Sequence, residues 1–519
     1  MTDVQERLLE SKMTEMHQAR SWSPRIIDKF KSLIHNGDDL SLYRINPLTF
    51  AHDRVISEAE SIDLFLHATR SGLFEMSWDV VCPQSGMVLE SFGALRTLKT
   101  HYVCGLCDVS GETNLDDFIE VTFTVSPQLR RLSFHDPGSL SVEDFHWKAR
   151  FLSHARLPGQ QVRFLDVLKG LVRGLSFLAP GSVTTIRAEL GPGGLAGINV
   201  ATQASFALPV VGEPVAAPLL LRIGYDGRCF YPSSSAVRPG PVIVEVVNSA
   251  AVRGSLLLIN WPSEILAQVT KPVLDFDPYM SGGMLLARQT FRRLFRSECV
   301  DEREGLGIRQ VTLLFTDLKG STAMYERLGD LNAYALVREH FALLGATVQE
   351  HSGAIVKTIG DAVMAAFSRP SDAISAALHM LEAIERFNGE HGDPSIILKI
   401  GAHCGPSIAV TLNDNLDYFG QTVNVAARVQ SLAEAGEICL SEALFSAPDV
   451  SRLLSGHRLV AFEAPLRGVE GMACVYRVMP ANLKSLIYAC LPPAPRHFWA
   501  HAFHHLQREM LPKRRRIQC

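Results

Sequence analysis

The chain has 519 residues, of which 47% are hydrophobic, and its formal net charge is −4. A chain of this length is too long for one hydrophobic core, so we expect three or four domains. Nothing in this nearly balanced charge indicates nucleic acid or an acidic lipid surface as the main partner, because such partners favour basic surfaces.

The apolar stretches and the cysteines predict a cytoplasmic protein without an integral membrane segment. The N-terminus lacks the apolar core of a signal peptide. Residues 205–224 are interrupted by Glu213 and three prolines, and residues 254–261 are too short to span a bilayer. The ten cysteines are scattered singly apart from Cys104 and Cys107, a pattern typical of reduced thiols.

The first half of the chain predicts a mixed α+β region in several parts. Residues 1–45 are polar and helical, typical of an N-terminal arm, and residues 46–204 change from helical periodicity to alternating strands. Residues 205–277 contain β-type runs separated by Pro and Gly, which predicts a β-sandwich-like segment. Residues 278–307 combine an amphipathic helix at 282–296 with a charged, Gly-containing linker.

Two short cysteine motifs lie about 20 residues apart, as Cys82-Pro-Gln-Ser85 and Cys104-Gly-Leu-Cys107. Two CxxC motifs at this separation would predict a zinc ribbon. Ser85 replaces one thiol, which leaves three cysteines, with His101 as a candidate fourth ligand. Two interpretations stay open: the insert binds a structural zinc ion, or it is a degenerate ribbon held by ordinary packing.

Residues 308–479 alternate regularly between strands and helices. The apolar strand 311–315 leads into a helical region and then into a hairpin joined at Gly360-Asp361, and a further helix and strand follow. This βαββαβ-like order predicts a ferredoxin-like α/β sandwich. Residues 480–519 are basic and rich in histidine, and we expect them to form a C-terminal tail.

The first chemical motif is LLFTDLKGST. It puts Asp317 at the end of an apolar strand, directly before Gly320, Ser321 and Thr322, where a helix should begin. A carboxylate at such a turn can hold Mg²⁺ while the free N–H groups of the helix N-terminus bind phosphates. Ordinary helix capping by these residues is the alternative.

The second and third motifs add to the first. Asp361 sits at the tip of the hairpin KTIGDAVMAAF, a position that by itself indicates only turn chemistry. The segment DYFGQTVNVAARVQ puts Asn424 and Arg428 four residues apart, on one face of a helix. The three motifs together resemble the catalytic domain of class III adenylyl/guanylyl cyclases, over about residues 308–479.

The resemblance implies a two-metal active site. Asp317 and Asp361, with the backbone carbonyl of Leu318, would bind two Mg²⁺ or Mn²⁺ ions that polarise the ribose 3′-hydroxyl and the triphosphate. Asn424 would orient the ribose, and Arg428 would stabilise charge on the α-phosphate. Positioning and electrostatics carry most of the catalysis in phosphoryl transfer.

Two further residues address the base. Lys357 only donates hydrogen bonds and ionised Asp417 only accepts them, which matches the N1 acceptor and the 6-amino donor of adenine. The expected reaction is therefore ATP to cyclic AMP and pyrophosphate. A guanylate cyclase and a non-catalytic nucleotide-binding regulator are the alternatives.

One departure and one oligomeric requirement accompany the resemblance. Family members usually carry a triphosphate-binding lysine where this chain has Arg467, which keeps the charge but differs in shape. Lys357 and Asp361 share one hairpin yet serve opposite sides of the reaction, so the resemblance implies a head-to-tail homodimer. The N-terminal half resembles uncharacterised regions of some bacterial cyclases, and we expect it to be regulatory.

Overall fold

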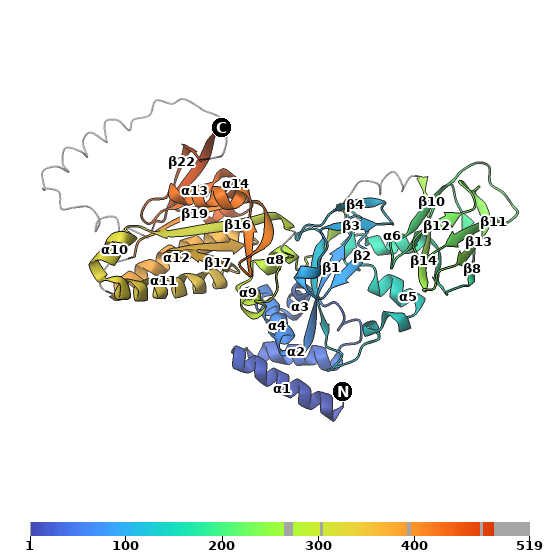
Figure 1. Ribbon diagram of the computed structural model, residues 1–519, viewed down its shortest axis with the longest axis horizontal. Coiled ribbons are helices and arrows are strands. Elements are labelled where there is room, and N and C mark those ends of the chain that lie inside the picture. Colours follow the sequence, from blue (N-terminus) through green and yellow to red (C-terminus); the bar gives the residue numbers. More distant parts are fainter. Residues whose placement is uncertain (1, 264–272, 302–304, 392–395, 468–470, 482–519) are drawn as a thin grey trace.

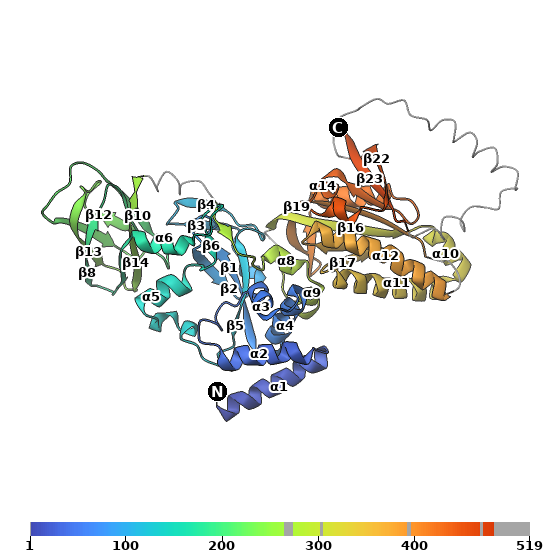
Figure 2. The same ribbon diagram turned by 180° about the vertical axis from the view of Figure 1, so that it is seen from behind.

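The computed structural model describes residues 2–263, 273–301, 305–391, 396–467 and 471–481. These residues form three parts in a row: a central α+β part, a pair of β-sheets on one side of it, and a C-terminal α/β domain on the other (Figure 1). Figure 2 shows the same row from behind. Within the described residues, no helix is long and apolar enough to cross a membrane.

The central part combines four helices with an antiparallel sheet of order β2-β1-β5. Its helices and strands are α1 (Asp3–Ala19), α2 (Pro24–Asn36), α3 (Pro47–Arg54), α4 (Glu58–Ser71), β1 (Phe74–Val81), β2 (Val88–Phe92) and β5 (Ile119–Val125). The helices begin at caps that the sequence supplies, such as Thr2, whose side chain accepts from the Gln5 N–H. α1 packs on α4 and buries Leu9, Met13 and Met16, so this segment contributes to the core.

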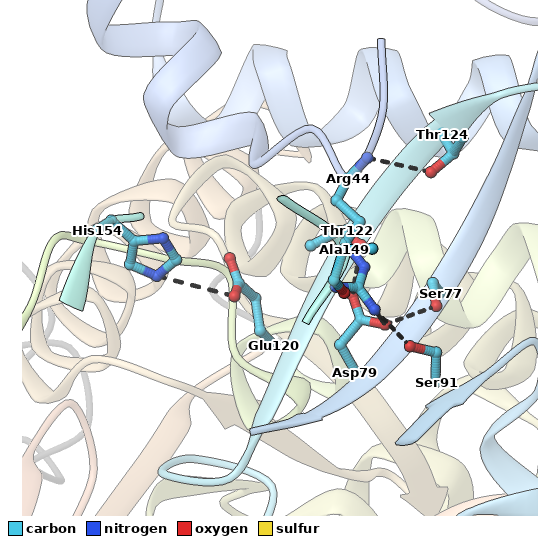
Figure 3. A network of polar contacts seen from close by, with 9 residues as sticks. All are labelled: Arg44, Ser77, Asp79, Ser91, Glu120, Thr122, Thr124, Ala149 and His154. Carbon is cyan, nitrogen blue, oxygen red and sulfur yellow. Dashed lines mark hydrogen bonds and ion pairs between the residues drawn. The ribbon is translucent and has the colours of Figure 1, made fainter. Parts of the chain in front are cut away.

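A buried polar network crosses this sheet (Figure 3). Asp79 of β1 accepts hydrogen bonds from Thr122 Oγ1 at 2.7 Å and from Ser77 Oγ at 2.9 Å. The Arg44 guanidinium lies 3.4 Å from the same carboxylate, and its Nη2 donates to Ser91. A buried carboxylate is stable only when it is paired and hydrogen-bonded in this way.

Short elements accompany the central sheet. β3 (His101–Cys104) and β4 (Val109–Glu112) form a hairpin. The others are η1 (Leu95–Thr97), η2 (Ser133–His135), η3 (Pro137–Ser139), α5 (Val142–Asp144), η4 (Phe145–Ala149), β6 (Ala155–Arg156), α6 (Phe164–Leu171) and β15 (Asp275–Phe276).

The second part consists of two four-stranded sheets, of order β10-β9-β14-β7 and β12-β11-β13-β8, which share one apolar core. Their strands are β7 (Val172–Leu178), β8 (Val183–Leu190), β9 (Gly193–Asn199), β10 (Ser205–Val210), β11 (Leu219–Tyr225), β12 (Phe230–Pro232), β13 (Gly240–Asn248) and β14 (Gly254–Pro262). The pair of sheets starts earlier than the predicted residue 205. β8 exposes alternate Val, Thr and charged residues, so its sequence lacks the apolar run that marked the later strands.

The prediction of a single amphipathic helix at 282–296 is wrong. Two short helices stand in its place, α8 (Gly282–Leu286) and α9 (Gln289–Leu294), separated at Arg288, whose φ of −98° and ψ of 123° are extended. Arg288 is buried, and the Gln289 N–H after it donates to the Gly353 carbonyl of the C-terminal domain. Contacts with the rest of the chain therefore override the helical periodicity.

The C-terminal domain is built on a sheet of order β17-β18-β16-β19-β21-β23-β22, with β20 paired to β19. Its elements are β16 (Leu306–Leu318), α10 (Ser321–Leu328), α11 (Asp330–Glu350), β17 (Ala354–Ile359), β18 (Ala362–Phe367), α12 (Pro370–His391), β19 (Leu398–Leu412), β20 (Asn415–Phe419), α13 (Gln421–Ser431), β21 (Ile438–Ser441), α14 (Glu442–Phe445), α15 (Val450–Leu453), β22 (Arg458–Pro465) and β23 (Met472–Met479). The predicted mixed α/β fold of this domain is confirmed.

The two faces of this sheet belong to different cores. Along β16, Leu314 and Leu318 pack with the helices α11 and α12, whereas Leu313 and Phe315 point to the other face. Such alternation is the period of a strand buried on both sides. The second face shares its core with the central part of the molecule, so the two halves of the chain are packed together. The predicted tail at 480–519 lies almost entirely outside the described residues.

Candidate active site

The first metal-ligand candidate, Asp317, lies near the carboxyl end of β16. Its register partner on β19 is Lys399, and Lys399 Nζ is 2.7 Å from Asp317 Oδ2. One third of the Asp317 side chain is exposed, so solvent and small ions reach its carboxylate. The next residue, Leu318, buries its side chain, which leaves only its backbone available to the site.

The second candidate, Asp361, follows Gly360 in the turn between β17 and β18. Gly360 has φ +64°, a conformation that glycine adopts without strain. β18 pairs with β16 at Val363 opposite Thr316, and this antiparallel register brings Asp361 to the sheet end where Asp317 lies. Asp361 Oδ2 is buried and has no hydrogen-bond partner among the described residues.

The predicted phosphate-binding turn lies directly after Asp317. Gly320 has φ +75° and precedes α10, whose first residues are Ser321 and Thr322. Among the described residues no side chain caps this helix, and its first backbone bond is donated by Met324 to the Gly320 carbonyl. The N–H groups of the first turn are therefore available to an anion.

The base-reading candidates face each other. Lys357 of β17 lies with Nζ 2.5 Å from Asp417 Oδ2 of β20, across 60 residues of sequence. Asp417 is 9% exposed and its other oxygen accepts from the Tyr418 N–H, so its position is fixed. Lys357 is 40% exposed and presents its ammonium to solvent. The two side chains form one hydrogen-bonding edge with a donor beside an acceptor.

Asn424 and Arg428 lie on α13, as the helical spacing predicted. Asn424 is exposed and Arg428 half-buried. The helix lies very close to β19, because a Cβ on Gly401 would come within 2.1 Å of the Gln430 Cα. Only glycine permits this approach, which fixes the height of α13 above the sheet.

The predicted site residues therefore fall into separate groups within one chain. Asp317 and Asp361 share one end of the sheet, and Lys357 contacts Asp417. In the parts of the chain that the structure describes, no hydrogen bond or ion pair joins Asn424 or the Arg428 guanidinium to these side chains.

Arg467 is exposed just after β22, and the neighbouring residues 468–470 lie outside the described residues. Its triphosphate role stays a prediction. Lys399 is the residue that sequence reasoning missed. The signal was a single charged residue in the apolar strand IILKIGA, which the Asp317 carboxylate on the neighbouring strand explains.

The helix α9 of the N-terminal half touches both strands that carry the base-reading pair. Gln289 Oε1 accepts from the Ile355 N–H of β17 at 2.7 Å. Arg292 Nη1 donates to the Leu416 carbonyl of β20 at 2.7 Å, and its guanidinium lies over the Tyr418 ring. The N-terminal half is thus in direct contact with the segment that holds Lys357 and Asp417.

The three candidate zinc ligands also come together, away from this site. The Sγ atoms of Cys82, Cys104 and Cys107 lie within 4.8 Å of one another. His101, the candidate fourth ligand, is exposed on β3 and is not part of this group among the described residues. A zinc ribbon is not established by this arrangement.

Comparison with known proteins places the chain. The model of a family of unknown function, DUF5939, matches residues 9–293, which is more than half of the chain. The chain belongs to this family. The adenylate and guanylate cyclase catalytic domain matches residues 306–457, so this DUF5939 protein carries a class III nucleotide cyclase domain after its DUF5939 region. The predicted resemblance is thereby confirmed.

Relatives of the cyclase domain include enzymes of both specificities. An adenylate cyclase of Anabaena cylindrica is 29% identical over 33% of this chain and 37% of its own length. Guanylate cyclase 2G of Mus musculus is 33% identical over 23% of this chain and 12% of its own length. The chain thus spans little more than a third, or less, of these curated relatives.

Among solved structures, the guanylate cyclase domain of RhGC from Catenaria anguillulae in complex with GTP is 25% identical, with a TM-score of 0.30. That match covers 34% of this chain and 98% of the solved chain.

Proposed function

We propose that this DUF5939 protein is an adenylate cyclase that converts ATP to 3′,5′-cyclic AMP and pyrophosphate. The observation that carries the choice of ATP is the contact of Lys357 Nζ with Asp417 Oδ2 at 2.5 Å. It sets a donor beside an acceptor within the cyclase domain. Adenine needs this combination, with Lys357 donating to N1 and Asp417 accepting from the 6-amino group.

Guanine is disfavoured by the same pair. Its N1–H would meet the Lys357 ammonium and its O6 the Asp417 carboxylate, so a donor would face a donor and an acceptor an acceptor. Each polar group left unpaired in this way costs about 1–3 kcal/mol. The pair supports a preference for ATP over GTP of at least tenfold, since about 1.4 kcal/mol is a factor of ten.

The residues at the sheet end suit divalent metal ions. Asp361 Oδ2 is a buried anionic oxygen without a partner among the described residues, and a cation would compensate it. Carboxylate and carbonyl oxygens are the ligands that Mg²⁺ and Mn²⁺ prefer. Asp317, Asp361 and the Leu318 carbonyl would hold two such ions. Bound there, the ions supply Lewis-acid polarisation of the ribose 3′-hydroxyl and of the phosphate oxygens.

The other side chains position ATP for an internal displacement. The ribose 3′-oxygen forms a bond to the α-phosphorus, the bond to the β-phosphate oxygen breaks, and the 3′ proton passes to solvent. The turn at Gly320 donates N–H groups to the phosphates, Asn424 holds the ribose, and Arg428 and Arg467 offset the negative charge of the transferring and leaving groups.

The separation of these groups supports a homodimer. In one chain, no hydrogen bond or ion pair between described residues links Asn424 or the Arg428 guanidinium to Asp317 or Asp361. In a two-fold dimer, each site would take its metal aspartates from one chain and its base, ribose and transition-state residues from the other. The contact of α9 with the strands of Lys357 and Asp417 supports a regulatory role for the N-terminal half.

Product analysis tests the proposal. The purified full chain is incubated with ATP or GTP and Mg²⁺ or Mn²⁺, and cyclic nucleotides are quantified by mass spectrometry, with Asp361→Asn as the matched inactive control. Cyclic AMP from ATP, at more than ten times the rate of cyclic GMP from GTP, is expected. Predominant cyclic GMP would identify a guanylate cyclase. Nucleotide binding without any cyclic product would identify a non-catalytic regulator.

A further inference from the structure

The DUF5939 region brings three thiols together from two turns of the chain. Cys82 directly follows β1, Cys104 ends β3, and Cys107 lies in the turn toward β4. Their Sγ atoms all lie within 4.8 Å of one another. Cys82 and Cys104 are fully buried, and all three cysteines are free. Ser85, whose Oγ lies 3.6 Å from Cys104 Sγ, is also buried.

The distances in this cluster fit one tetrahedral ion. Zinc–sulfur bonds of about 2.3 Å at tetrahedral angles separate two sulfurs by about 3.8 Å, and Cys82 Sγ is 3.9 Å from Cys107 Sγ. A sulfur and an oxygen ligand of zinc are separated by about 3.6 Å, and Cys104 Sγ is 3.6 Å from Ser85 Oγ. A disulfide, by contrast, needs a sulfur separation of about 2.05 Å.

The surroundings hold these atoms in place. The Met87 N–H donates to Ser85 Oγ at 3.3 Å, and the Cys82 N–H donates to the Met87 carbonyl at 2.9 Å. Bonds of this kind orient metal ligands and are part of a metal site. Ser85 and Cys107 also line a cavity of about 390 Å³, which gives an ion a way to the cluster.

We propose that Cys82, Cys104 and Cys107 bind one Zn²⁺ ion, with the Ser85 hydroxyl as the fourth ligand. Thiolates together with a neutral oxygen are ligands that a borderline-soft divalent cation accepts. This site is independent of the cyclase reaction and lies in the other half of the chain.

The ion stabilises a junction between two parts of the fold. Gly105, between two of the ligands, donates its N–H to Gln203 Oε1 of the β-sheet pair, and a Cβ there would come within 2.1 Å of the Gln203 carbonyl oxygen. Zinc fixes the Cys104–Cys107 turn to Cys82, which follows the central sheet. The same turn contacts the pair of β-sheets through Gly105, so the ion links the central part to that pair of sheets.

Metal analysis of the full chain tests the site. The protein is expressed with zinc in the medium, freed of any affinity tag, dialysed and measured by plasma mass spectrometry. About one zinc per chain is expected, and Cys104→Ser and Cys107→Ser should lose it. Cys229→Ser is the control, because Cys229 is an exposed thiol elsewhere in the DUF5939 region and should not affect the zinc content.

Two further measurements do not depend on how the cysteine variants fold. Ser85→Cys should slow zinc removal by a chelator roughly tenfold, because a fourth thiolate replaces a hydroxyl. Wild type reconstituted with Co²⁺ should show thiolate-to-cobalt charge-transfer absorption. The proposal is overturned by wild type that carries no zinc, takes up none on addition and shows no such band, or by Ser85→Cys releasing zinc as fast as wild type.

Discussion

Glu120 and His154 face each other in the core of the DUF5939 region, with Glu120 Oε2 and His154 Nε2 3.8 Å apart (Figure 3). Neither atom has a hydrogen-bond partner among the described residues. Burial raises the pKa of Glu120 to about 8 and lowers the pKa of His154 to about 4. Both side chains are therefore neutral at pH 7, and the pair is not an ion pair in spite of its geometry.

These pKa values make stability depend on pH in opposite directions. Folded Glu120 keeps its proton up to about pH 8, whereas the unfolded chain loses it near 4.5, so the free energy of unfolding falls as pH rises from about 5 to 8. Glu120→Gln should therefore raise the free energy of unfolding at pH 8 by at most a few kcal/mol and barely change it at pH 5. Urea unfolding at the two pH values is the measurement.

His154→Gln provides the contrast. Folded His154 loses its proton at about pH 4 and the unfolded chain near 6.5, so its penalty grows as pH falls through this range. This variant should stabilise the protein at pH 5 more than at pH 8. Equal gains at both pH values for either variant would exclude titration as the cause.

Substitution of Asp317 and of Asp361, the two metal-ligand candidates, should affect stability differently, because only Asp317 has an ion-pair partner in the described structure. Asp361→Asn should reduce cyclisation to less than a tenth, which is a barrier increase above about 1.4 kcal/mol, without lowering the melting temperature. Its Oδ2 has no hydrogen-bond partner within the described part of the chain that the substitution would remove. Asp317→Asn should inactivate the enzyme equally but also weaken the ion pair with Lys399, which is worth about 0–1 kcal/mol. Activity and calorimetric scans check both, and turnover above a tenth contradicts the metal assignment.

Specificity should follow the base-reading pair. Changing Lys357 to Glu and Asp417 to Cys supplies an acceptor to guanine N1 and a donor to O6, so ATP use should fall and relative GTP use should rise. The ratio of kcat/KM for the two nucleotides is the measurement. An active double variant with an unchanged ATP preference would show that these side chains do not contact the base.

Mixed dimers test the shared site. Asp317→Ala and Arg428→Ala chains should each be nearly inactive alone, because each homodimer lacks one component of both sites. After random subunit exchange about half of the dimers are mixed, and each has one of its two sites intact. Activity should recover to about a quarter of wild type. No recovery after verified exchange would place all catalytic residues within one chain.

The C-terminal fold was predictable because its local signals agree with its long-range contacts. The strand before Asp317 and the Gly360-Asp361 turn combine an apolar period with a glycine of positive φ, so few other structures compete. At 282–296 the period was equally clear, yet buried Arg288 interrupts it. The periodicity of one segment does not indicate which of its arginines another domain will bury, so the interruption at Arg288 could not be predicted.

The sequence names the candidate site residues, whose roles stay predictions, but it does not predict their contacts. The spacing of Asp361, Asn424 and Arg428 is encoded locally, in one turn and one helix. Two contacts depend instead on strand register and hairpin packing, which bring together residues distant in sequence. These are the contact of Lys399 with Asp317 and that of Ser85 with Cys104. The short pattern CPQS lacks its second thiol, so it could not distinguish a metal ligand from a turn.

If the DUF5939 region regulates the proposed reaction through α9, ATP itself is expected to act as an effector. Gln289 and Arg292 hold the strands on which Lys357 and Asp417 stand, so a molecule that moves α9 by binding the DUF5939 region changes the affinity for ATP. Linkage is reciprocal: ATP must then change the affinity for that molecule by the same factor, which titrations in either order would measure. A regulatory DUF5939 region would in this way also report whether the active site is filled.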